Sequence, residues 1–106
     1  MLAPFPAGRY RAAMKTIYYG SQEFIVANDL ANEIMRASTE FGSEGRLIQI
    51  PIACYRGNEA AEVSVIVGAG IPVMFADSKS VLDDPPRTLE AWSWIRDEID
   101  ALQSDQ

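Results

Sequence analysis

The connections between the strand-like segments of this sequence are short, and this feature constrains its fold more than any other. Segments 15–19 and 23–27 are rich in β-branched and aromatic residues, and only the turn residues 20–22 separate them. Parallel neighbours need a crossover of a dozen or more residues. The pattern therefore predicts an antiparallel hairpin at the start of the fold.

Three further strands are predicted later in the chain, at 46–55, 62–67 and 71–76. The third segment alternates apolar residues and contains Pro51. Proline has no backbone N–H to donate to a neighbouring strand, so we expect this strand to lie at an edge or to bulge at Pro51.

Two segments carry the apolar spacing of an amphipathic helix. The first is predicted to begin with Asn28 as its N-cap and to end near Gly42, and the second to run from Thr88 to about Leu102. The order β-β-α-β-β-β-α predicts an α+β two-layer sandwich, with a mainly antiparallel sheet of about five strands and two helices.

The chain of 106 residues is long enough for one domain with its own core. Residues 1–13 are rich in proline, glycine and alanine and lack strand alternation, so we expect a flexible N-terminal arm or extension there. Residues 14–106 are predicted to form a single α+β domain.

The segment V-I-V-G-A-G-I-P-V at 65–73 begins as a nucleotide-binding loop does, with an apolar run followed by two glycines. A dinucleotide fingerprint requires G-x-G-x-x-G at the start of a helix, but here Val73 stands at the third position and strand-like residues follow. We predict instead a hairpin loop at residues 68–70, joining the fourth and fifth strands, and no cofactor.

The sequence lacks the usual general base, because it contains no histidine, and it has only one cysteine that could act as a thiol nucleophile. These absences exclude histidine-dependent triads and dyads as well as zinc sites built from cysteine and histidine. Cys54 lies on the apolar face of a predicted strand and is expected to be a buried hydrophobe. We therefore predict a protein that is not an enzyme and has no catalytic, cofactor or metal residues. A lone cysteine also favours a cytoplasmic location.

The chain is acidic, with fifteen acidic and nine basic residues and a formal charge of −6. Without Arg9 and Arg11, fifteen acids face seven bases, which gives −8 for the remainder. This charge disfavours nucleic acid, and no segment is apolar enough for a membrane span. A loop with three aspartates at positions 77, 83 and 84 offers oxygen ligands for a hard cation, but it lacks the spacing of an EF-hand.

If both helices cover one face of the sheet, the other face is unusually apolar. We predict that this second face is a homodimer interface, and that an off-stripe tryptophan extends it. The predicted interface residues are Tyr18, Phe24, Val26, Ile66, Met74 and Trp94.

The function expected from these observations is that of a small acidic, non-enzymatic interaction or accessory protein that self-associates through this face. Two alternatives stay open. One is an acidic inhibitor or nucleic-acid mimic that binds a basic protein. The other is a binder of a small ligand or a divalent cation.

Overall fold

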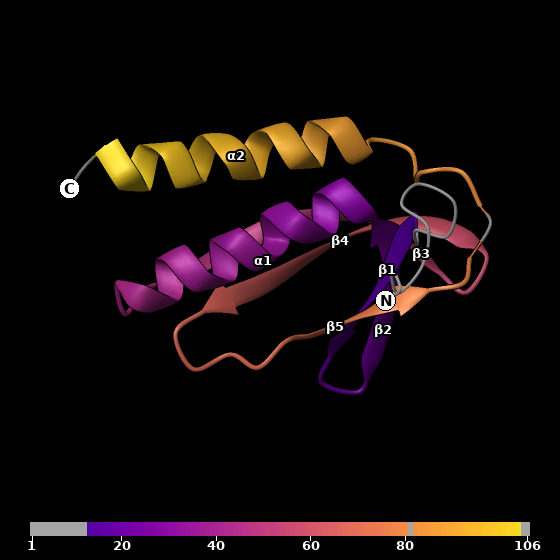
Figure 1. The fold of residues 1–106 in the computed structure, drawn as a ribbon, viewed down its shortest axis with the longest axis horizontal. Helices are drawn as coiled ribbons and strands as arrows, with labels where there is room; N and C mark the ends of the chain where they lie inside the picture. Colours follow the sequence, from indigo (N-terminus) through magenta and orange to yellow (C-terminus); the bar gives the residue numbers. More distant parts are fainter. Residues whose placement is uncertain (1–12, 81, 105–106) are drawn as a thin grey trace, which may run out of the picture.

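The computed structural model describes residues 13–80 and 82–104, and it confirms the predicted α+β fold with an antiparallel five-stranded sheet and two helices (Figure 1). Helix α1 lies across the sheet, and α2 packs on α1 and on β3. Residues 1–12 of the predicted arm lie outside the described residues. The elements in chain order are β1 (Met14–Tyr19), β2 (Gln22–Ala27), α1 (Asn28–Ser43), β3 (Leu47–Arg56), β4 (Glu59–Gly68), β5 (Met74–Ser78) and α2 (Thr88–Ser104).

The strand order in the sheet is β4-β3-β2-β1-β5, and this order corrects one prediction. The predicted hairpin around residues 68–70 does not form, because β4 and β5 lie at opposite edges of the sheet. Strand β5 pairs with β1 instead, with Phe75 opposite Ile17. The segment 69–73 therefore crosses from one edge to the other, and β5 begins at Met74 rather than at residue 71.

The sheet is curved strongly enough for β1 to reach β4, although β2 and β3 lie between them in the strand order. The hydroxyl group of Tyr19 donates a hydrogen bond to the carbonyl oxygen of Ile66 at 2.8 Å. It also lies 3.4 Å from the Ile66 backbone nitrogen, whose N–H donates to it. One side chain thus satisfies both backbone groups of a residue on the outer edge of β4.

Both predicted ends of α1 need correction. The N-cap residue is Ala27, and the side chain of Asn28 makes no capping bond. At the other end the helix continues past Gly42 to Ser43, and the left-handed residue is Gly45, with φ +70°. The Gly45 N–H donates to Gly42 O at 3.0 Å and the Arg46 N–H to Phe41 O at 2.9 Å, which together form a Schellman motif.

The hydrophobic core lies between the sheet and the helices, and it contains two residues that the sequence pattern places on the exposed face. Phe24 is 4% exposed and Val26 is fully buried. The register places Phe24 opposite Ile17, whereas Tyr18 lies opposite Glu23. Phe24 and Tyr18 therefore point to opposite faces of the sheet, so Phe24 and Val26 do not belong to a surface shared with Tyr18.

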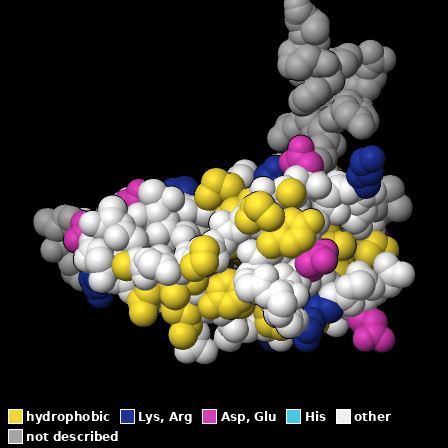
Figure 2. Space-filling view, turned by 90° about the horizontal axis from the view of Figure 1, so that it is seen from below, with side chains coloured by type: hydrophobic (Ala, Val, Ile, Leu, Met, Phe, Trp, Pro, Cys, Tyr) yellow, Lys and Arg dark blue, Asp and Glu magenta, His cyan; other side chains and the backbone are white. Residues whose placement is uncertain are grey.

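The face that carries neither of the two described helices is still apolar. The register places Tyr18 beside Met74, and Ile25 beside Tyr55, on this side of the sheet. The same alternation along β3 and β4 adds Ile66. Figure 2 shows hydrophobic side chains gathered along this side, with charged groups mainly at its margins. We call the surface formed by Tyr18, Ile25, Tyr55, Ile66 and Met74 the open face.

Candidate functional site

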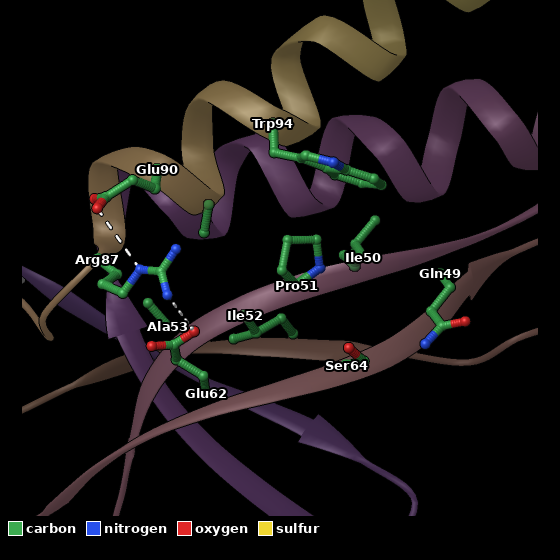
Figure 3. A pocket seen from close by; sticks show the side chains of 11 residues that line it. Gln49, Ile50, Pro51, Ile52, Ala53, Glu62, Ser64, Arg87, Glu90 and Trp94 are labelled. Atoms are coloured by element: carbon green, nitrogen blue, oxygen red, sulfur yellow. Dashed lines mark hydrogen bonds and ion pairs between the residues drawn. The ribbon is translucent and has the colours of Figure 1, made fainter.

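A groove of about 540 Å³ separates the first half of α2 from the β3–β4 hairpin (Figure 3). We call it the α2–β3 groove. Its walls are mostly apolar, and its polar groups come from both strands and from the start of α2. The lining residues are Gln49, Ile50, Pro51, Ile52, Ala53, Glu62, Ser64, Arg87, Glu90, Ala91 and Trp94.

The β3–β4 register shows which backbone groups face the groove. Arg56 and Glu59 close the two-residue turn of the hairpin, so they form a hydrogen-bonded pair. Hydrogen-bonded and non-hydrogen-bonded pairs alternate from there along an antiparallel ladder. Pro51, opposite Ser64, falls on a non-hydrogen-bonded pair, so its nitrogen points away from β4. Its missing N–H therefore costs the β3–β4 ladder nothing.

Strand β3 lies inside the strand order, yet most of it has no second neighbour among the described strands. Its pairing with β2 is limited to Tyr55 opposite Ile25. The stretch that contains Pro51 is thus an edge, as the proline predicted, although the strand as a whole is not outermost. The backbone groups of Gln49 and Ala53 that point away from β4 also lie on this edge.

The two tryptophans of α2 have different environments. Trp94 is 42% exposed and projects over Pro51 and Ile50 in the groove (Figure 3). Trp92 packs against the hydrophobic core, and the guanidinium group of Arg96 lies 5.7 Å from its ring centre. Trp94 is therefore the large apolar side chain that α2 contributes to the groove.

Arg87 lies at one end of the groove, and its backbone conformation is energetically unfavourable. Its φ angle is +69°, in the left-handed region that costs about 1–2 kcal/mol for a residue with a side chain. Its guanidinium group lies 3.4 Å from a carboxylate oxygen of Glu62 on β4 and 3.6 Å from one of Glu90 on α2. The residue with the strained backbone is thus also the residue whose side chain links the two walls of the groove.

A second hollow, of about 710 Å³, lies between the starts of α1 and α2. It contains Glu33, which the helical pattern would place among the solvent-facing residues but which is only 4% exposed. The carboxylate of Glu33 accepts a hydrogen bond from Arg36 at 2.8 Å and lies 3.6 Å from Arg96. This pairing ties α1 to α2 and accounts for the buried charge.

The aspartate loop shows no cation site within residues 13–80 and 82–104, where no group of three or more metal-ligating side chains comes together. Asp77 forms an ion pair with Lys15 at 2.7 Å. The carbonyl oxygen of Asp83 accepts a hydrogen bond from the hydroxyl group of Tyr55 at 2.8 Å. Asp77 therefore belongs to β5, opposite Lys15, and not to the predicted loop, whereas Asp83 holds the loop to β3.

Cys54 is buried, in the place that the sequence predicts for it. Burial raises the pKa of its thiol, and the nearby charge of Arg56 offsets part of that shift. A thiol with a raised pKa forms little of the thiolate that nucleophilic chemistry requires. The site around Cys54 is thus part of the core.

The structure brings three of the predicted interface residues, Tyr18, Ile66 and Met74, to one face. Trp94 lies in the α2–β3 groove, where Gln49, the neighbour of Ile66 across the ladder, also contributes to the wall. Neither described helix is long and apolar enough to cross a membrane. No protein-family model matches the sequence, and no curated protein and no solved structure matches it.

Proposed function

We propose that this protein is a small, acidic, cytoplasmic and non-enzymatic interaction protein that self-associates through the open face. The observation that carries the proposal is the exposure of large apolar side chains on a face without helices. Met74 is 60% exposed and Ile66 is 43% exposed there. Large apolar side chains exposed on one face in this way commonly mark an interaction site.

The dimensions of the sheet suit a reversible dimer. If it were flat, a sheet of five strands about 4.8 Å apart would be roughly 24 Å wide, and six residues would make it roughly 20 Å long. Because the sheet is curved, two copies packed face to face would bury at most about 1,000 Å² in total, which is close to the lower limit for specific interfaces. We therefore expect dissociation on dilution.

The lack of histidine and of an accessible cysteine supports a non-enzymatic role. The sequence has no histidine, and its only cysteine is buried in the core. The single cysteine is also the basis for placing the protein in the cytoplasm.

Sedimentation velocity over a range of protein concentrations tests the proposal. We expect the wild type to shift from monomer to dimer as its concentration rises, and Met74→Lys to raise the dimer dissociation constant at least tenfold. Leu89→Lys is the matched control, because Leu89 is 70% exposed but lies on α2. A wild type that stays monomeric throughout, or equal effects of the two substitutions, would refute the proposed interface.

A further inference from the structure

We infer that the α2–β3 groove binds an extended peptide segment of a partner protein. The segment adds a strand to the free edge of β3, places an apolar side chain against Trp94 and carries a lysine or arginine toward Glu62 and Glu90. The groove adjoins the open face, because Gln49 lies opposite Ile66 on the same side of the sheet, but the inference rests on the edge of β3 and on α2 and does not depend on self-association.

The first support is the edge itself. Residues 49–53 are consecutive and their side chains alternate between the two faces of β3, yet all five line the groove. The groove therefore runs along the backbone of β3. The N–H and C=O of Gln49 and the C=O of Pro51 point away from β4 on this side, and an extended peptide can pair with such groups.

The second support is the apolar wall opposite this edge. Trp94 lies over Pro51 and Ile50, and Ala91 lines the same space from α2 (Figure 3). Alternate side chains of an extended peptide point to opposite sides, so one set can pack against the indole ring while the other faces solvent. A partly exposed tryptophan in a concave site is a common anchor for a partner.

The third support is charge. The side chains of Glu62 and Glu90 are 57% and 64% exposed, and the carboxylates of both lie beside the guanidinium group of Arg87. Two carboxylates and one guanidinium leave one net negative charge at this end of the groove. The whole chain carries −6, so a basic segment is attracted and an acidic one is repelled.

Isothermal titration calorimetry with the peptide acetyl-Val-Lys-Val-Lys-Val-Lys-amide tests the inference on the full chain. We expect saturable binding with one peptide per protomer. Replacement of every lysine in the peptide by glutamate should abolish binding, and methylation of alternate peptide nitrogens should weaken it at least tenfold. Equal binding of the methylated peptide would overturn strand addition, and absence of saturable binding by the unmodified peptide would overturn the site.

Variants of the protein locate the binding. Trp94→Ala should raise the dissociation constant about tenfold, and the exposed substitution Glu62→Gln, which leaves the core untouched, should raise it about threefold. Leu89→Ala, outside the groove, should leave it unchanged. If Glu62→Gln and Trp94→Ala, each shown to be folded by circular dichroism, bind as the wild type does, the peptide does not use this groove. If the protein dimerises as proposed but does not bind the peptide, this inference is wrong while the proposed function stands.

Discussion

Replacement of Gly68 by alanine should be among the most destabilising single changes in this chain. Gly68 ends β4 and has φ +123°, a backbone conformation that residues with side chains rarely adopt. A Cβ atom at this position would lie 2.2 Å from the carbonyl oxygen of Arg46 and 3.1 Å from the Cα atom of Leu47. Both neighbours are backbone atoms, so the clash cannot be relieved by rotating a side chain.

The expected loss follows from two contributions. The unfavourable backbone conformation costs about 1–3 kcal/mol. Moving the chain away from Arg46 also weakens the 3.0 Å hydrogen bond from the Ala69 N–H to the Arg46 carbonyl oxygen, at a cost of about 1 kcal/mol. A loss of about 2–4 kcal/mol is a large part of the roughly 5–15 kcal/mol by which a domain of this size is stable.

Two other glycines provide matched controls in the same region. Gly70 has φ +77°, but a Cβ atom added there would meet nothing within 4 Å beyond its chain neighbours, so Gly70→Ala should cost only about 1–2 kcal/mol. Gly42 lies within α1, and its Cβ would meet only ordinary contacts, the nearest at 3.6 Å. Gly42→Ala should therefore stabilise the protein by about 0.5–1 kcal/mol.

Urea unfolding followed by tryptophan fluorescence measures all three free energies of unfolding. The reasoning requires the loss for Gly68→Ala to exceed that for Gly70→Ala, and Gly42→Ala to move in the opposite direction. If Gly68→Ala and Gly70→Ala cost the same, the close approach of Gly68 to Arg46 does not exist in solution.

Two further predictions concern Arg87 and Cys54. Arg87→Gly should be about 1 kcal/mol more stable than Arg87→Ala, because only glycine relieves the left-handed backbone while both variants lose the same exposed ion pairs; equal stabilities by urea unfolding would contradict this. For Cys54, burial raises the pKa of the thiol in the folded state, so the folded state keeps its proton when the unfolded state loses it. The stabilisation should be present below the unfolded-state pKa of about 8.5 and be lost as the pH rises above it. The free energy of unfolding of the wild type should then fall more steeply above pH 8.5 than that of Cys54→Ala, and parallel pH profiles would show that the thiol does not contribute.

The types and the order of the elements could be predicted because they depend on local patterns. The spacing of apolar residues distinguishes helices from strands, and Pro51 marked a strand without a full set of backbone partners. Pairing between distant strands leaves no such local signal. The glycines at 68 and 70 are compatible with a hairpin, and only the observed pairing of β1 with β5 shows that the chain crosses the sheet instead.

The candidate groove could be predicted only in part, for the same reason. The position of Trp94 off the apolar stripe of its helix predicted that it extends an interface, whereas the structure places it in the groove. The groove itself depends on β2 separating from β3 after a single residue pair, which is a property of the whole sheet. The burial of Glu33 leaves no signal in the sequence, because its pairing with Arg96 joins two helices that are distant along the chain.

The position of β5 has a consequence for the synthesis of this protein. Lys15 of β1 pairs with Asp77 of β5 across 62 positions of the sequence, so β1 leaves the ribosome well before its outer neighbour exists. At about 5–20 residues per second, the wait lasts about 3–12 seconds. During that time β1 and β2 can form their hairpin, but the outer edge of β1 has no strand beside it. An unpaired edge is a template for pairing with another chain. The nascent protein is therefore most prone to aggregate before β5 has been synthesised and has paired with β1.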